Sequence, residues 1–304
     1  MGKSRNNFLL IFFGSLAVCW LAACGPVLET TKPPEIPRSN PVAPKSYVKG
    51  EVIRIPMNVE DKNLSLEATL FKPEASGPFP LLVLSHGTPR DLAQRRIRMR
   101  YPLQCRALVD MGFVVVVPMR RGYGNSEGDY AEVEGDCKEA RYYETGRESA
   151  RDLWATVRYM KAQPYVNPRQ VVLVGNSAGG FASLALASQG FDGLLGVISF
   201  AGGRGSRTDR VCDPPALIAA FAKFGRTTRV PTLWIYTEND SYFGPSLVRY
   251  LHRAYTQAGG QARLVMLPPF SGEGHFLFPE AQGLPLWKCL VQSFTDSLGV
   301  SRPQ

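Results

Sequence analysis

The sequence predicts an α/β fold, with a mostly parallel central β-sheet and helices on both faces. First, short runs rich in Val, Ile and Leu recur along the chain, and strands that are buried on both faces have this composition. Second, segments with helical periodicity separate these runs, which is typical of a parallel sheet. Third, 304 residues with 44% hydrophobic content can bury one large core.

The first 23 residues predict a signal peptide. A short basic start precedes an apolar run over residues 8–18, which is too short for a membrane span. Leu-Ala-Ala-Cys follows at residues 21–24 and resembles the lipobox of bacterial lipoproteins. This resemblance implies that Cys24 becomes the lipid-anchored N-terminus, and Gly25 after it implies the outer membrane in a two-membrane bacterium. The alternative is an ordinary signal peptide with an incidental cysteine.

Residues 24–46 are expected to form an extended tether. Six prolines fall between residues 25 and 45, and proline excludes both a helix and a central strand. The catalytic domain is therefore expected over residues 47–304.

The predicted domain opens with an antiparallel hairpin, because apolar and polar residues alternate over 51–57 and 64–71. The buried strands are predicted at residues 79–85, 113–118, 170–174, 194–200, 232–236 and 262–267. Helices are predicted at residues 147–161, 180–188, 245–258 and 285–298, the first of them with apolar residues at spacings of three and four.

Two segments interrupt this alternation of strands and helices. Residues 125–145 are acidic and contain glycine, and residues 204–228 carry a cysteine and a short apolar patch. Both follow predicted strands, on the side where α/β sheets bind their ligands. We expect these insertions to form a small cap over the site.

Four cysteines remain after the predicted signal and anchor segments, which is an even number for an oxidising compartment. They allow three pairings, and we favour Cys137 with Cys212 because both fall in polar, loop-like insertions. The alternative is four free thiols. No Cys-x-x-Cys or Cys/His cluster has the spacing of metal ligands, so we expect no metal and no cofactor.

The formal net charge of +9 is spread over charged loops and forms no basic stripe interleaved with aromatic residues. Nucleic acid binding is therefore not expected. A mild attraction to anionic membrane surfaces or acidic substrates is compatible with this charge. Arg204, Arg207 and Arg210 in the second insertion either favour an anionic substrate or form a solvated face.

The pattern Gly-x-Ser-x-Gly occurs twice, at residues 124–128 and 175–179. A nucleophile elbow needs a strand that runs directly into the serine and a helix that begins directly after it. Ser177 has this context, because a predicted strand precedes it and a small-residue helix follows. Ser126 does not, since a loop precedes it and an acidic segment follows. We therefore expect Ser177 to be the nucleophile and Ser126 to be a loop residue near the site.

The serine needs a base, and the chain offers three histidines. His275 is the best candidate, because it lies in a glycine-rich loop after the last predicted strand. His86 precedes the nucleophile and is expected to shape a loop, and His252 is expected on a helix face. The acid should lie between nucleophile and base at the end of a strand. Asp240 is the first choice and Glu238 the second.

The oxyanion of an acyl intermediate needs two backbone donors. One is expected from Ala178, at the start of the helix after the nucleophile. The other should come from the loop after the third predicted strand, where we choose Thr88.

Together these motifs resemble the α/β-hydrolase superfamily, close to its dienelactone-hydrolase-like and prolyl-oligopeptidase-like branches. The resemblance covers roughly residues 51–298. It rests on residues 86–89, 121–128, 175–179, 238–240 and 274–275. Dienelactone hydrolases use a cysteine where this chain has Ser177, and prolyl oligopeptidases carry a propeller for which the N-terminal segment is too short.

These residues predict a serine hydrolase that cleaves a carboxylic ester through Ser177, His275 and Asp240. A serine peptidase of the prolyl-oligopeptidase-like type is the enzymatic alternative. A non-catalytic lipoprotein that binds a ligand on a hydrolase scaffold is the alternative from another class. The expected partners are a small ester or peptide substrate and, through the lipid anchor, the membrane of the bacterial cell envelope.

Overall fold

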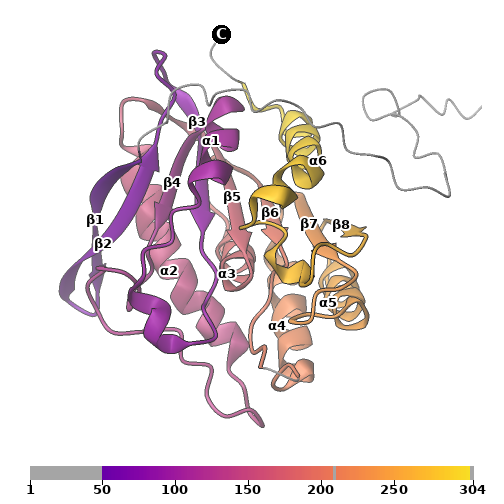
Figure 1. Cartoon of the computed structure of the whole chain (residues 1–304). Helices are drawn as coiled ribbons and strands as arrows, with labels where there is room; N and C mark the ends of the chain where they lie inside the picture. Colours follow the sequence, from indigo (N-terminus) through magenta and orange to yellow (C-terminus); the bar gives the residue numbers. More distant parts are fainter. Residues whose placement is uncertain (1–49, 208–209, 302–304) are drawn as a thin grey trace, which may run out of the picture. The chain divides into compact units, whose positions relative to one another are not determined.

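The computed structural model describes residues 50–207 and 210–301 (Figure 1). The predicted signal peptide, the anchor Cys24 and the tether lie outside the described residues. Within the part of the chain that the structure describes, no helix combines the length and apolar character that a bilayer span requires.

The fold is built on an eight-stranded sheet with the order β1-β2-β4-β3-β5-β6-β7-β8. Its strands are β1 (Glu51–Val59), β2 (Lys62–Phe71), β3 (Phe79–Ser85), β4 (Val114–Pro118), β5 (Val166–Asn176), β6 (Leu194–Phe200), β7 (Thr232–Thr237) and β8 (Ala262–Leu267). β1 pairs antiparallel with β2 and β2 with β4, while all other neighbours are parallel. The prediction of a mostly parallel sheet is confirmed.

Helices cover both faces of this sheet (Figure 1). They are α1 (Pro102–Asp110), α2 (Tyr142–Lys161), α3 (Ala178–Ala187), α4 (Pro214–Thr227), α5 (Pro245–Gln257) and α6 (Leu284–Ser297). Residues of α2, α3, α4 and α5 share one buried core, and residues of α1 and α6 share the other. Successive residues of β3 alternate between these cores, Leu81 facing the first and Leu82 the second, because strand side chains point to opposite faces.

The prediction of a cap insertion over residues 204–228 is wrong for the second half of this segment. Residues 204–207 and 210–213 lie outside any helix, but most of the remainder is α4, whose Leu217 and Phe221 are fully buried in the core. A start signal was present in the sequence: Asp213 caps the helix by accepting from the amide of Ala216 (3.1 Å), and Pro214 occupies its first turn. In the first insertion, residues 125–145, the loop ends where α2 begins at Tyr142.

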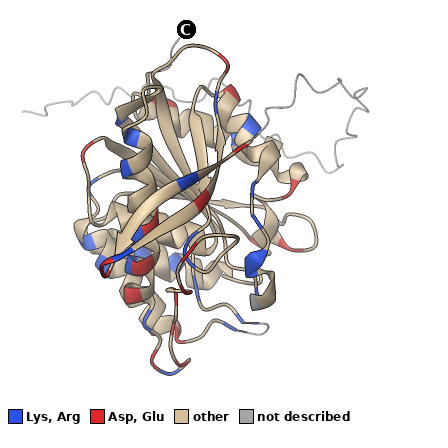
Figure 2. Cartoon of the chain, turned by 90° about the vertical axis from the view of Figure 1, so that its left-hand side faces the viewer, with Lys and Arg blue, Asp and Glu red and all other residues tan. Residues whose placement is uncertain are grey.

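Charged residues of both signs are interspersed over the face that carries β1 and β2 (Figure 2). An ion pair contributes to this mixing: Glu51 in β1 pairs with Lys72, directly after β2 (3.9 Å). Basic residues therefore do not form a separate positively charged patch on this face.

Candidate active site

Ser177 occupies the turn between β5 and α3, with a positive φ that is rare for a non-glycine residue (φ 55°, ψ −123°). Two glycines allow this turn to pack tightly. A Cβ at Gly175 would lie 2.2 Å from the carbonyl group of Gly179, and one at Gly179 would lie 2.0 Å from the backbone oxygen of Ser85. Neither site can accept a side chain, so the pattern around Ser177 is required by backbone contacts. Ser177 has the strand–turn–helix context of a nucleophile elbow.

A cavity of about 490 Å³ opens beside Ser177. Its lining comes from the elbow, from the loop after β3, from the two loops predicted as cap, and from the loop after β7. The lining includes Thr88, Arg90, Glu132, Glu134, Ala178, Arg204, Arg207 and Tyr242. The residues after β3, β5 and β7 meet here because parallel strands bring their carboxyl ends to one edge of the sheet.

Asp240 and His275 form a buried pair next to this cavity. The Nδ1 atom of His275 lies 3.2 and 3.1 Å from the two carboxylate oxygens of Asp240. The Asp240 carboxylate also accepts hydrogen bonds from the amides of Tyr242 (2.8 Å) and Phe243 (3.0 Å). Asp240 follows β7, and His275 lies in a short 3-10 helix after β8 (Gly274–Phe276). The structure thus brings together the predicted acid and base, which are 35 positions apart.

The second choice for the acid, Glu238, is exposed at the end of β7. A different carboxylate supports the base: Glu273 accepts a hydrogen bond from the backbone amide of His275 (3.0 Å) and another from that of Ser241 (3.1 Å). Burial raises the pKa of Glu273, but hydrogen bonds from Ser241 and His275 outweigh it and lower the pKa below 4.5. Glu273 was not singled out from the sequence, although it lies two residues before the predicted base.

Thr88 and Ala178, the two residues expected to donate to an oxyanion, both line the cavity with Ser177. Ala178 is the first residue of α3, so its amide has no acceptor within the helix. The loop that carries Thr88 lies against the nucleophile, because a Cβ at Gly87 would be 3.3 Å from the Cβ of Ser177. This arrangement can present two donors to one side of Ser177.

His86 and His252 have structural partners. The Nδ1 of His86 lies 2.7 Å from the Gly87 carbonyl oxygen, and its Nε2 accepts from the amide of Arg120 (3.2 Å). Burial, together with the positive charge of Arg120, lowers the pKa of His86 to about 3. A neutral His86 therefore holds the loop after β3, which is the role expected for it. On α5, the Nε2 of His252 lies 2.9 Å from the Ala262 carbonyl oxygen.

A buried carboxylate that was not predicted from the sequence lies in the cavity wall. Glu132 is 1% exposed and forms ion pairs with Arg120 and Arg204. Tyr123 donates to Glu132 (2.9 Å) and shares a hydrogen bond with the Thr88 hydroxyl (2.7 Å). Burial raises the pKa of Glu132, but the charges of Arg120 and Arg204 hold it well below its usual 4.5. Through Tyr123 and Glu132, hydrogen bonds and ion pairs connect the predicted oxyanion loop to both insertions.

Two arginines of the second insertion, Arg204 and Arg207, differ from each other in burial. Arg204 is 1% exposed and is engaged by Glu132, so it forms no solvated face. Arg207 is 53% exposed on its side chain and pairs with Glu134 (3.4 Å). Both residues line the cavity. The sequence could not separate them, because their carboxylate partners lie about seventy residues earlier in the chain.

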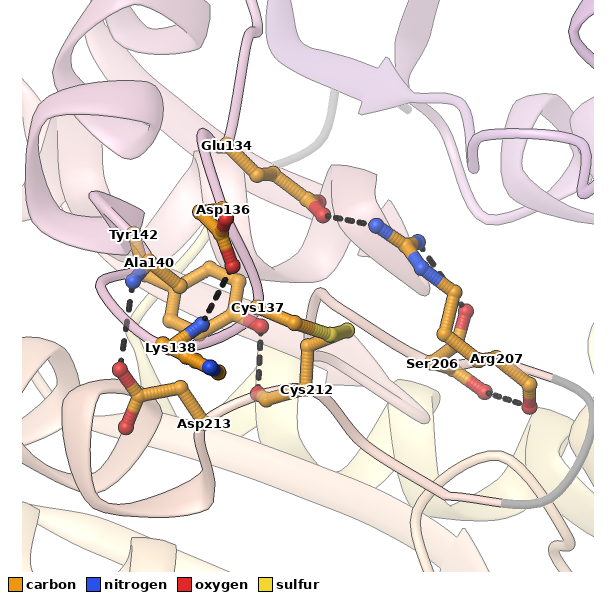
Figure 3. The surroundings of a disulfide bond; sticks show 10 residues. All are labelled: Glu134, Asp136, Cys137, Lys138, Ala140, Tyr142, Ser206, Arg207, Cys212 and Asp213. Atoms are coloured by element: carbon orange, nitrogen blue, oxygen red, sulfur yellow. Dashed lines mark hydrogen bonds and ion pairs between the residues drawn. A yellow bond between two sulfur atoms is a disulfide. The ribbon is translucent and has the colours of Figure 1, made fainter.

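A disulfide joins the two cavity loops (Figure 3). It pairs Cys137 with Cys212, as favoured from the sequence, with a Cα–Cα distance of 4.8 Å. Around it, Tyr142 donates to the Cys212 carbonyl oxygen (2.6 Å), and Asp213 accepts from the Ala140 amide (3.2 Å). The remaining cysteines of the domain, one buried and one exposed, are free thiols. The loops predicted as cap are therefore cross-linked into one wall of the cavity.

Solved structures of several α/β hydrolases resemble this chain. A putative dienelactone hydrolase from Klebsiella pneumoniae has a TM-score of 0.59 at 15% identity, over 82% of this chain and 99% of that chain. An esterase from Pyrococcus furiosus has a TM-score of 0.58 at 14% identity, over 89% and 98%. Dipeptidyl peptidase 4 from Porphyromonas gingivalis has 0.60 at 15%, over 83% of this chain and 36% of that chain. At these identities the likeness shows the fold.

No curated protein sequence matches the chain. The expected resemblance to dienelactone-hydrolase-like and prolyl-oligopeptidase-like α/β hydrolases is confirmed by the structures above. A sequence family also matches, over residues 62–259, which is more than half of the chain. With its serine-hydrolase-type α/β fold, this protein belongs to the X-Pro dipeptidyl-peptidase family, S15.

Proposed function

We propose that this protein hydrolyses carboxylic esters, with Ser177 as nucleophile, His275 as general base and Asp240 as the acid that orients it. The observation that carries the proposal is the buried Asp240–His275 pair, with Nδ1 3.1 Å from the nearer carboxylate oxygen. It lies at the same edge of the sheet as the Ser177 elbow. Acyl transfer by a serine needs a base oriented by a buried carboxylate, and here that pair lies at the sheet edge that carries the serine on its tight turn.

In the proposed reaction, the Ser177 hydroxyl attacks the ester carbonyl carbon while His275 takes its proton. The amides of Thr88 and Ala178 donate to the oxyanion that forms. His275 then gives the proton to the leaving alcohol, and the acyl group stays on Ser177. A water molecule attacks the acyl-enzyme with His275 again as base, which releases the carboxylic acid and restores the hydroxyl. Asp240 stabilises the imidazolium in both steps.

The charges around the cavity favour an ester over a peptide with a free amino terminus. A protonated amine binds best to a carboxylate whose charge is not already neutralised. Among the described lining residues, however, each carboxylate pairs with two arginines: Glu132 with Arg120 and Arg204, and Glu134 with Arg204 and Arg207. Arg90 adds a further positive charge to the lining. These contacts support a neutral or anionic substrate.

The second candidate is a peptidase that releases dipeptides with proline in the second position. The match to the X-Pro dipeptidyl-peptidase family favours it, as does the likeness to a dipeptidyl peptidase. For this activity, the ion pairs of Glu134 with Arg204 and Arg207 (both 3.4 Å) would have to open so that Glu134 could bind the substrate amine.

Turnover of short p-nitrophenyl esters, compared with Xaa-Pro p-nitroanilides, separates the two candidates. We expect kcat/KM to be higher on the esters and to be lost in Ser177→Ala. Dominant anilide cleavage would instead establish the peptidase. A fluorophosphonate probe should label Ser177 in the folded wild-type protein. Absence of both labelling and turnover would favour the non-catalytic binding lipoprotein.

We also propose that the protein is anchored in the cell envelope through a lipid on Cys24. The support is the Leu-Ala-Ala-Cys sequence after a short apolar run, followed by a proline-rich segment long enough to act as a tether. Metabolic labelling with an alkyne fatty acid should mark the wild-type protein. Cys24→Ala should lose the label and leave the membrane fraction, whereas an unlabelled wild type would refute the anchor.

A further inference from the structure

The ring of Tyr242 lies between His275 and Arg90. It stacks on the imidazole of His275 with a centroid distance of 3.9 Å and an interplanar angle of 4°. The guanidinium carbon of Arg90 lies 3.6 Å from the centroid of the same ring. Two planar groups this close cannot share one face of a ring, so His275 and Arg90 cover opposite faces of Tyr242.

This stack restrains the base in a way that Asp240 cannot. A hydrogen bond at Nδ1 fixes one edge of the imidazole but leaves its plane free to turn about that bond. A parallel ring at van der Waals distance removes this rotation. Tyr242 is itself fixed to the acid, because its backbone amide donates to Asp240 (2.8 Å). Acid, base and stacking ring thus form one unit.

Arg90 connects this unit to the wall of the cavity. Its guanidinium donates to the Ser206 hydroxyl (3.2 Å) and to the Arg207 carbonyl oxygen (3.0 Å), both in the loop after β6. Arg90 also follows Thr88 by two residues, and both line the cavity. One side chain therefore joins the predicted oxyanion loop, the cross-linked wall and the outer face of Tyr242.

We propose that Tyr242 is a positioning residue for the base His275, and that Arg90 holds Tyr242 in place. The inference rests on the proposed function, since it assigns these roles in the same hydrolytic reaction. Positioning affects the chemical step more than substrate binding. Loss of the stack should therefore lower kcat with little change in KM, because small misplacements of a reacting group cost about 10- to 100-fold in rate.

The test is the steady-state hydrolysis of p-nitrophenyl butyrate by Tyr242→Leu, Tyr242→Phe and Arg90→Ala. We expect kcat to fall about 10- to 100-fold in Tyr242→Leu. Tyr242→Phe, which keeps the ring, should recover most of this loss, and Arg90→Ala should show a smaller decrease. Arg229→Ala is the matched control, because Arg229 likewise donates two hydrogen bonds, here to backbone carbonyl oxygens, but does not line the cavity.

Three results would overturn the proposal. An unchanged kcat in Tyr242→Leu would show that the stack does not act on the base. A rise in KM alone would make Tyr242 a substrate contact instead. If circular dichroism shows that Tyr242→Leu does not fold, Arg90→Ala becomes the deciding variant, because Arg90 is exposed. An Arg90→Ala protein with wild-type kcat would then overturn the inference. Failure of the proposed function is distinguishable, because the wild type itself would then not hydrolyse p-nitrophenyl butyrate.

Discussion

Two copies of Gly-x-Ser-x-Gly occur in this chain, and they fold differently. At residues 175–179 the serine lies on a turn between strand and helix and lines the cavity, and its glycines are needed because backbone atoms approach them. At residues 124–128 the glycines adopt positive φ angles of 52° and 87° within a loop. There Ser126 is 4% exposed, donates to the Met119 carbonyl oxygen (2.5 Å) and accepts from the Glu67 amide (2.9 Å).

The two copies show that Gly-x-Ser-x-Gly by itself has no fixed structural role. The copy around Ser177 is held by backbone packing, which leaves its hydroxyl free for chemistry. The copy around Ser126 is held by side-chain hydrogen bonds, which occupy its hydroxyl. The loop that continues from Ser126 is likewise held by side chains, through Glu132 and the Cys137–Cys212 disulfide.

The sharpest test of the comparison replaces each serine by alanine. Ser177→Ala should lower kcat/KM on p-nitrophenyl esters about 10⁴-fold or more, because the proposed nucleophile is removed. Ser126→Ala should keep activity within about twofold and cost about 1 kcal/mol of stability, because one hydroxyl that satisfies buried backbone groups is removed. Large losses of activity in both variants would break the distinction.

Adding a methyl group at Gly179 tests whether backbone packing holds the elbow. Because its Cβ would meet the Ser85 oxygen at 2.0 Å, Gly179→Ala should lower the free energy of unfolding by about 4 kcal/mol or more. Gly244→Ala is the control, since nothing lies within 4 Å of that Cβ and φ is −59°. Urea unfolding compares the two, and equal stabilities would contradict the packing argument.

Removing the charge of Glu132 tests the side-chain anchors of the other loop. At pH 7, Glu132→Gln should cost about 3 kcal/mol, because it leaves Arg120 and Arg204 without their buried counter-charge. The pKa of Glu132 is held below its usual 4.5 in the folded protein, so this stabilisation is present above 4.5 and is lost as the pH falls toward the folded pKa. The difference between variant and wild type should therefore shrink below pH 4.5; a constant difference would exclude this charge effect.

The disulfide should have the smallest effect of the four. Cys137→Ser with Cys212→Ser should cost about 2 kcal/mol in thermal or urea unfolding, because a constraint on the unfolded chain is removed. Since the loops line the cavity but do not carry Ser177, KM should rise more than kcat falls. Replacing the exposed free Cys289 by serine is the control. A loss of kcat equal to that of Ser177→Ala would place the loops in the catalytic machinery instead.

Much of the fold was predictable from local patterns. Every predicted buried run corresponds to a strand, because parallel strands covered on both faces must be apolar along their length. Two of the six α-helices in the described residues, α1 and α4, were not predicted. α1 is short, and α4 was read as part of a cap because its apolar residues follow a polar, cysteine-containing loop. Only packing against α2 and α5 identifies α4 as a core helix.

The α/β architecture and the candidates Ser177, Asp240 and His275 could be predicted from the sequence alone. Strand composition, the elbow motif and the order of the residues along the chain are all signals that can be read without the tertiary structure. Only the tertiary structure decided that Glu132 binds Arg120 and Arg204, and that Tyr242 stacks between His275 and Arg90. The Glu132–Arg204 pair and both contacts of Tyr242 join segments tens to more than a hundred residues apart. No spacing rule encodes such contacts; they form where the carboxyl ends of the strands and their loops converge.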